Sequence, residues 1–302
     1  MDPPFPAPFS AMTQDSAALE QLRREIDRID DQLHDLLMRR TSLVGDIAAA
    51  KGDRRVTLRP GREAQILRRL LDRHAGPFPK LAVVRIWREI VGALTGLQGP
   101  FTVAVHAAGR STAAIDLARN HFGVVAPLHA LRSPGQVVRA VADGEAAVGV
   151  IPLTPGTEAA DDAEPWWTSL MLESGDAPRV VARLPFAPTP AVKGSAEPPQ
   201  ALVIACRDHD CSGDDRTLAV LETGPDLSRD RLRAILSAAG LEPAELLAIH
   251  RHGAQWLHMV EILGHVTAAD ARLAALVAPK DPVGRIAVVG GYATPFAPEA
   301  LV

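Results

Sequence analysis

The sequence contains few cysteines, no long apolar run and little excess of either charge. Its two cysteines, Cys206 and Cys211, are too few for a disulfide framework, which favours a reducing compartment. No run of about 18 apolar residues occurs, so no membrane-spanning helix is predicted, and residues 1–6 lack the cationic region of a secretory signal. The net charge of −4 gives no overall field for nucleic acid, so any anion site must be a local cluster of Arg and Lys. We therefore expect a cytoplasmic protein with neither nucleic acid nor membrane as partner.

The composition is that of a globular protein with more than one domain. Of the 302 residues, 47% are apolar and 23% are charged, which excludes wholesale disorder, and the length allows two or three domains. Residues 1–15 are rich in proline and small residues, which predicts a disordered tail and makes Met12 an alternative start.

One long helix is predicted from Ser16 to Lys51. This segment contains no proline and only one glycine, Gly45, and its apolar residues recur at alternating spacings of three and four. Such a helix is about 54 Å long and extends beyond a small helical domain. A partner must then cover its apolar stripe, which favours an intertwined homodimer. The stripe consists of Leu19, Leu22, Ile26, Ile29, Leu33, Leu36, Leu43 and Ile47.

Two shorter helices are predicted next, from Pro60 to about His74 and from Leu81 to Gln98, and Gly99-Pro100 marks a boundary. Alternating strands and helices then indicate a parallel α/β sheet, followed by a βαββαβ unit of the ferredoxin-like type. The first set is strand 101–105, helix 112–121, helix 134–143 and strand 147–151, with loops at 153–165 and 185–200. The second set is strand 216–222, helix 228–239, strand 245–250, strand 255–263, helix 268–277 and strand 285–289.

Cations interrupt the apolar stripe of the first helix. Arg40 and Lys51 continue its spacing and lie eleven residues apart, almost three turns, so they share one face, and Arg23 flanks the other end. They are either surface charges whose stems cover apolar surface or the lining of an anion site, because an unpaired cation in an apolar seam is costly. Residues 59–63, Arg-Pro-Gly-Arg-Glu, begin the second helix, and Gln98 ends the third.

These residues together resemble the all-helical chorismate mutases. The pattern covers residues 17–98 and comprises Leu22-Arg23-x-x-Ile26-Asp27-x-x-Asp30, Leu36-Leu37-x-x-Arg40, Ala50-Lys51, Arg59-Pro-x-Arg62-Glu63 and Arg88-Glu89-Ile90. The resemblance implies an intertwined dimer of three-helix chains that rearranges chorismate to prephenate in aromatic amino acid biosynthesis. This pericyclic reaction needs no cofactor or metal. It needs a site that holds a dicarboxylate in a reactive conformer and stabilises charge on the ether oxygen.

The resemblance also implies roles for the polar residues. The partner subunit's Arg23 and this chain's Arg40 grip the two carboxylates, because guanidinium groups bind carboxylates bidentately. Lys51 donates to the ether oxygen and to a carboxylate. Glu63 accepts from the ring hydroxyl, and Gln98 is the second donor to the ether oxygen. Lys51, Glu63 and Gln98 are therefore the expected catalytic residues.

Three neighbouring residues have less direct roles in this interpretation. Arg59 stands where some relatives carry Asp and contributes through its backbone at the helix start. Arg62 orients Glu63 and the loop, and Leu94 replaces a small polar residue, so one auxiliary hydrogen bond is absent. The expected substrate-binding set is Arg23, Arg40, Lys51, Arg59, Glu63 and Gln98.

The following region resembles the dehydratase part of bifunctional chorismate mutase–prephenate dehydratases, but without its motifs. Residues 141–152 match a helix-to-strand segment of that family. The family's Gly-Pro-x-Gly turn, however, is His106-Ala-Ala-Gly109 here, and its Glu-Asn-Ser/Thr is Leu153-Thr154-Pro155. Its Thr-Arg-Phe segment is Gln200-Ala201-Leu202. Dehydratase activity is therefore not expected.

The final region resembles an ACT regulatory domain. It retains the family's Gly-His as Gly264-His265. The family's Glu-Ser-Arg-Pro motif is replaced here by the divergent segment Ala248-Ile-His-Arg251. An amino-acid effector is thus a possible partner, and the sequence leaves this open.

The predicted protein is a multidomain chorismate mutase with a non-catalytic C-terminal half. The expected domains are an all-α intertwined-dimer domain at 16–98, an α/β, periplasmic-binding-like domain at 101–212 and an α+β, ferredoxin-like ACT-like domain at 213–302. Three alternatives remain open: a bifunctional mutase and dehydratase, a non-catalytic ligand sensor, and an isochorismate-type pyruvate lyase. Glu63 favours the mutase over the lyase, because it serves the ring hydroxyl of chorismate.

Overall fold

The computed structural model describes residues 10–51, 58–107, 112–153, 165–172, 177–188, 198–277 and 282–301. Residues 1–9 of the predicted tail and most of the two predicted loops lie outside these ranges. The chain divides into two units, Met1–Arg54 and Arg55–Val302, and each is described by itself. Within the described ranges, no helix combines the length and the apolar character that a membrane span requires.

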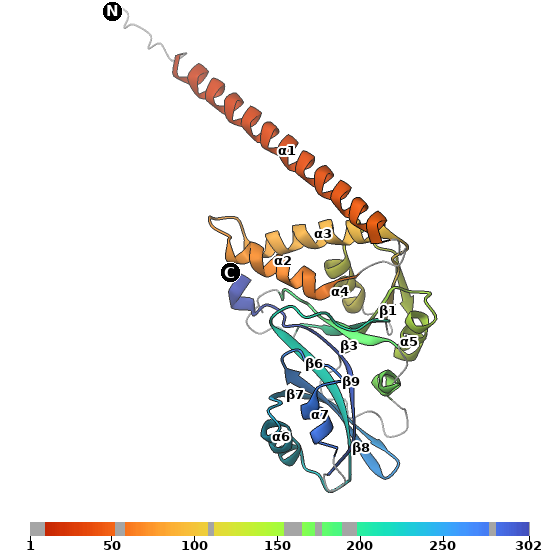
Figure 1. Ribbon diagram of the computed structural model, residues 1–302. Helices are drawn as coiled ribbons and strands as arrows, with labels where there is room; N and C mark the ends of the chain where they lie inside the picture. The colour runs from red at the N-terminus through yellow and green to blue at the C-terminus, as the bar shows by residue number, and fades with distance from the viewer. Residues whose placement is uncertain are drawn as a thin grey trace, which may run out of the picture. The chain divides into compact units, whose positions relative to one another are not determined.

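The described residues of the first unit form the helix α1 (Ser10–Lys51), which confirms the predicted long helix (Figure 1). It begins at Ser10 rather than Ser16, because no proline lies between these residues to interrupt it. The eight apolar residues of the predicted stripe are between 46% and 62% exposed. Burial of a side chain such as Leu or Ile contributes about 1.5–3 kcal/mol, so the stripe leaves considerable apolar surface unburied.

The second unit begins with the two shorter helices, α2 (Pro60–Asp72) and α3 (Lys80–Gln98), as predicted. Pro60 occupies the first position of α2, where its missing N–H costs nothing. The carboxylate of Asp210 accepts from the Gly61 N–H at 3.3 Å and so satisfies an open donor of the helix. A Cβ at Gly61 would lie 2.3 Å from the Asp210 carbonyl oxygen, so this close approach requires glycine.

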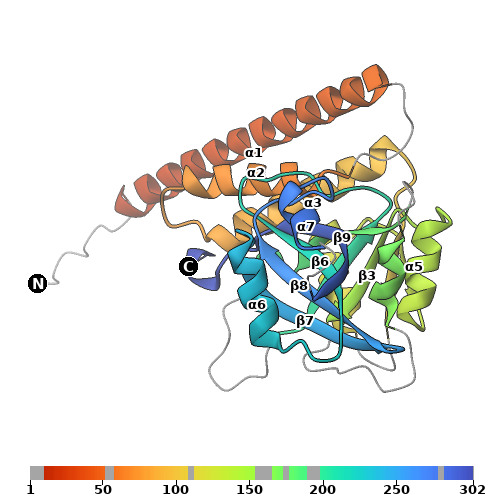
Figure 2. The ribbon, with the colours of Figure 1, turned by 60° about the horizontal axis from the view of Figure 1, so that its bottom comes forward.

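Among the described residues of the second unit, nine strands form one sheet, which is the body of this unit (Figures 1 and 2). Its order is β2-β1-β3-β5-β4-β9-β6-β8-β7. The first five strands in the chain are β1 (Val103–His106), β2 (Leu128–Leu131), β3 (Val148–Leu153), β4 (Arg179–Leu184) and β5 (Gln200–Ala205). β1 is parallel to β2 and β3, but β5 is antiparallel to both β3 and β4. The expectation of a wholly parallel sheet is therefore wrong beyond β3.

Two helices cover opposite faces of this part of the sheet. Successive side chains of a strand point to opposite faces, so neighbouring residues of β1 pack against different helices. Val103 and Val105 of β1 pack in one cluster with residues of α4 (Ala113–Phe122). Ala104 packs in another cluster with residues of α5 (Pro134–Ala142). The 3₁₀ helix η1 (Trp166–Met171) contributes the buried Trp167 to that second cluster, and η2 (Pro298–Leu301) lies near the C-terminus.

The remaining elements follow the predicted βαββαβ order. They are β6 (Asp215–Thr223), α6 (Arg229–Ala238), β7 (Pro243–His252), β8 (Gln255–Leu263), α7 (Ala271–Ala275) and β9 (Val283–Ala293). Their spatial order, β9-β6-β8-β7, places the fourth strand beside the first and the third between the first and second. β9 also pairs with β4, at Gly290. A Cβ added at Gly290 would lie 2.2 Å from the Val180 carbonyl oxygen, so this strand pairing requires glycine. The pairing joins strands β1–β5 and strands β6–β9 into one sheet.

Candidate active site

The cations of α1 differ in their partners. The exposed Arg23 forms an ion pair with Glu20 at 2.5 Å on the same helix. The Nη1 of Arg40 has no hydrogen-bond partner among the described residues. Lys51 is the last residue of α1, and its side chain lies outside the described part of the structure. Arg40 therefore has donor capacity that a carboxylate could use.

Glu63 is buried and paired. Its Oε2 lies 2.7 Å from Nη1 of Arg88 in α3, and the two side chains are 12% and 6% exposed. Burial raises the pKa of Glu63 above its ordinary value, and the positive charge of Arg88 opposes that rise. Burial likewise lowers the pKa of Arg88, opposed by Glu63. The charge of Arg88 thus favours the ionised form of Glu63, and burial favours the protonated form.

The residue that orients Glu63 is Arg88 and not Arg62, so the expectation for Arg62 is wrong. Arg62 donates instead to Gln65 on its own helix at 3.3 Å. Arg88 follows Val84 by one turn on the buried face of α3, where an apolar residue is normal. A cation at such a position is the signal in the sequence that could have identified this pair.

The start of α2 is fixed by charges from a distant loop. Nε of Arg59 lies 3.0 Å from the Asp210 carboxylate, which also accepts from the Gly61 N–H. Arg59 is half-exposed and already paired, so any substrate contact would compete with Asp210. This agrees with a contribution of Arg59 through the position of the helix start.

Gln98 is the last residue of α3. Its Nε2 donates to the carbonyl oxygen of Leu94 at 3.3 Å, and Leu94 is buried. The Cα atoms of Arg88 and Gln98 are separated by about 15 Å along the helix. Within the second unit, the structure therefore brings Arg59 and Glu63 together at the start of α2 and places Gln98 at the far end of α3.

The dehydratase-like positions of the second unit are enclosed by the sheet. Ala201 and Leu202 of β5 are fully buried, and Gln200 accepts from Arg183 at 2.7 Å. Ala201 and Leu202 therefore expose no side chain to a small molecule, whereas the half-buried Gln200 lines a cavity and pairs with Arg183.

The three helices and their charged residues are typical of the all-helical chorismate mutases. Residues 22–99 match the family model of chorismate mutase type II. The match confirms the predicted similarity of this part of the chain to the chorismate mutases.

The matching relatives are bifunctional proteins. The chain is 32% identical over 152 residues to a bifunctional chorismate mutase/prephenate dehydratase of Pseudomonas aeruginosa, covering 48% of this chain and 41% of that protein. It is 29% identical over 148 residues to the Stutzerimonas stutzeri protein of the same name, covering 47% of this chain and 40% of that protein. The chain thus spans well under two thirds of the length of these relatives.

Among solved structures, a prephenate dehydratase from Streptococcus mutans is similar with a TM-score of 0.45 and 14% identity. The similarity covers 64% of this chain and 98% of that one.

Proposed function

We propose that this protein is a chorismate mutase that rearranges chorismate to prephenate. The observation that carries the proposal is the type II mutase match over residues 22–99, which contains the cations of α1 and the Glu63–Arg88 pair. A purely structural helix pair gains nothing from a buried charge pair that apolar residues could replace. A site for an anionic substrate does require cations and one oriented carboxylate.

In the proposed mechanism the protein positions one substrate and stabilises developing charge. Arg40 and the partner's Arg23 hold the two carboxylates, which selects the compact conformer in which the new carbon–carbon bond can form. Lys51 and Gln98 donate to the ether oxygen as its carbon–oxygen bond breaks. No proton is transferred and no covalent intermediate forms, so the residues act only by binding and charge.

Glu63 acts in this mechanism as a fixed acceptor. Its carboxylate must be ionised to accept from the ring hydroxyl, and the 2.7 Å contact with Arg88 supports that form. Only Oε2 is occupied by Arg88, so the second carboxylate oxygen can accept from the substrate.

The proposed assembly is a homodimer in which the exposed stripe of α1 contacts a second copy. Its eight residues, each about half-exposed, form a continuous apolar surface of the kind that coiled-coil partners bury. The dimer would also bring Arg23 to the partner's site. In the cytoplasm, the expected compartment, Cys206 and Cys211 of each chain would stay reduced.

We further propose that residues 101–302 have no catalytic role, with domains at 101–212 and 213–302 and the second ACT-like. The burial of Ala201 and Leu202 supports the loss of dehydratase chemistry. An amino-acid effector remains part of this proposal, because the βαββαβ unit carries Gly264-His265 at a positive-φ turn.

A paired assay of the purified full-length protein tests the function. Chorismate is expected to disappear while prephenate accumulates, because the mutase residues are present and the dehydratase motifs are not. The measurement follows chorismate loss and phenylpyruvate formation at neutral pH, with and without phenylalanine. Phenylpyruvate at a comparable rate would establish the bifunctional alternative, and no loss of chorismate would leave the sensor interpretation.

Gln98 predicts how the mutase responds to pH. An amide donates at any pH, whereas a carboxyl group must be protonated to donate. We expect the turnover of the wild-type enzyme to be nearly constant between pH 5 and 8. The Gln98→Glu variant should be much less active across this range, because a carboxyl group with an ordinary pKa of about 4.3 is mostly ionised there, and it should recover activity as the pH falls below 5. The measurement is kcat against pH for both proteins, and a wild-type activity that falls steeply as the pH rises from 5 to 8 would contradict this role of Gln98.

A further inference from the structure

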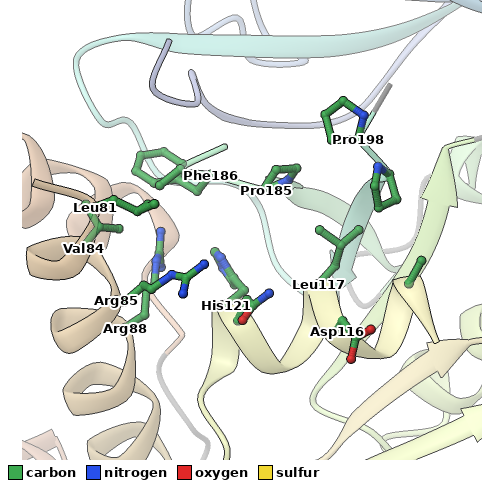
Figure 3. A pocket seen from close by; sticks show the side chains of 14 residues that line it. Leu81, Val84, Arg85, Arg88, Asp116, Leu117, His121, Pro185, Phe186 and Pro198 are labelled. Atoms are coloured by element: carbon green, nitrogen blue, oxygen red, sulfur yellow. The ribbon is translucent and has the colours of Figure 1, made fainter. Parts of the chain in front are cut away.

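A cavity of about 320 Å³ lies between α3 and α4, and Arg88 is one of its lining residues (Figure 3). It is closed by the segment after β4, which carries Pro185 and Phe186, and by Pro198. This volume is at the lower end of the range of small-molecule sites, about 300–1,000 Å³. All of its lining residues belong to the second unit.

Polar groups converge at the α3 end of the cavity. Figure 3 shows Arg85 and Arg88 directed from α3 towards His121 of α4. Arg85 is exposed and forms no hydrogen bond or ion pair with the described residues. Arg88 uses only Nη1, towards Glu63, so its other donors have no acceptor in the described part of the chain. Two guanidinium groups and an imidazole therefore face one space.

His121 adds a neutral hydrogen-bonding group. It is 9% exposed, and its ring contacts Phe122 edge-on at 4.7 Å without a hydrogen bond to any described residue. Burial and then the charge of Arg88 lower its pKa well below the ordinary value, so the ring is neutral at pH 7. Both His121 and Arg88 line the cavity, so an acceptor on a ligand there could reach the imidazole and the open donors of Arg88.

Most of the remaining lining is apolar, and Asp116 and Asn120 are its other polar residues. Val84 and Leu117 are buried, and the ring of Phe186 lies 5.0 Å from Cζ of Arg88. Pro185 and Pro198 complete a wall of rings opposite Leu117 (Figure 3). The one carboxylate among the lining residues, Asp116, accepts from the Thr112 hydroxyl at 2.9 Å.

We propose that this cavity is a binding site for a small monocarboxylate with an apolar, ring-sized body. The carboxylate would accept from Arg85, from the open donors of Arg88 and from His121, and the ring would lie between Phe186, Pro185 and Leu117. Glu63 already neutralises Arg88, so the net charge at the polar end suits one negative charge better than two.

Arg88 links this cavity to Glu63. A carboxylate that draws Arg88 towards the cavity weakens its hold on Glu63, so ligand binding changes the environment of a proposed catalytic carboxylate. This consequence rests on the proposed mutase function, whereas the binding itself does not.

Calorimetric titration of the full-length protein with 3-phenylpropionate tests the site, with 3-phenyl-1-propanol as the uncharged comparison. We expect one site per chain, binding of the acid but not of the alcohol, and affinity weakened about tenfold in Arg85→Gln, because a charge-assisted contact is lost. Arg119→Gln is the matched control, since it removes an exposed arginine of α4 that does not line the cavity. It should leave the affinity unchanged.

Equal binding of acid and alcohol, equal effects of the two substitutions, or no heat of binding would each overturn the site. Chorismate turnover is measured in parallel with and without the acid. A rate change in the wild type that Arg85→Gln weakens supports the link through Arg88. Binding with an unchanged rate overturns that link while the site stands. A protein without mutase activity leaves the titration as the deciding result.

Discussion

Replacing Arg88 with methionine is expected to lower the free energy of unfolding by about 3–5 kcal/mol at pH 7, because it leaves a buried carboxylate without its partner. Glu63 is 12% exposed, and Arg88 is its ion-pair partner at 2.7 Å. Methionine has a similar length and can contact Phe186, which Arg88 contacts in the wild type. The decrease in the free energy of unfolding therefore measures the loss of the charge and not the creation of a cavity. The measurement is urea unfolding at one fixed protein concentration, because an oligomer makes stability depend on concentration.

The destabilisation should depend on pH in a defined direction. Burial raises the pKa of Glu63 in the folded protein, and loss of Arg88 removes the main opposing charge. Above the unfolded pKa, about 4.3, the folded state then holds more protons than the unfolded state, so stability falls as pH rises towards the folded pKa. The difference between wild type and Arg88→Met should therefore be larger at pH 7 than at pH 5.

Two further variants separate this effect from others. Arg85→Met changes an exposed arginine on the same helix and should cost less than about 0.5 kcal/mol. Glu63→Gln combined with Arg88→Met removes both charges and should recover part of the loss. Equal destabilisation by Arg85→Met and Arg88→Met would contradict a special role for the buried pair.

The helices could be predicted from the sequence because their signals are local. The stripe of α1 repeats over its whole length, and Pro60 and Gly99 mark ends of α2 and α3. The βαββαβ order could also be predicted, since its strands are long and separated by turn residues.

Three strands could not be predicted. β2 is four residues long and half-exposed, so it carries little apolar pattern. β4 contains two arginines, one of which, Arg183, pairs with Glu261 at 2.8 Å in a distant strand. β5 pairs antiparallel with both neighbours, a register decided by tertiary structure.

The candidate site shows the same division. The residue types of the site and their spacing identified the mutase domain, which the family match confirms. The partners of two of those residues could not be predicted from spacing. Arg59 pairs with Asp210, 151 residues away in the sequence, and Glu63 pairs with Arg88, 25 residues away. The sequence shows which charges are present, but only the packing of α2 shows how they are paired.

Replacing Arg40 with alanine is expected to reduce kcat/KM for chorismate by at least about a hundredfold, because one substrate carboxylate loses a charged partner at the moment of reaction. Arg23→Ala should have an effect of similar size. Neither change should alter stability by more than about 0.5 kcal/mol, since Arg23 is exposed and Nη1 of Arg40 has no hydrogen bond among the described residues. Steady-state kinetics and urea unfolding measure the two effects separately.

Mixed dimers then decide whether the site is shared between two chains. If each site takes Arg23 from one chain and Arg40 from the other, a dimer of one Arg23→Ala chain and one Arg40→Ala chain has one intact site. Co-expression with two affinity tags isolates this dimer, and its activity should be about half that of the wild type. The control pairs a wild-type chain with a chain carrying both substitutions, which damages both sites and should be nearly inactive. The opposite result, an inactive first dimer and a half-active control, would place both arginines in a site built by one chain.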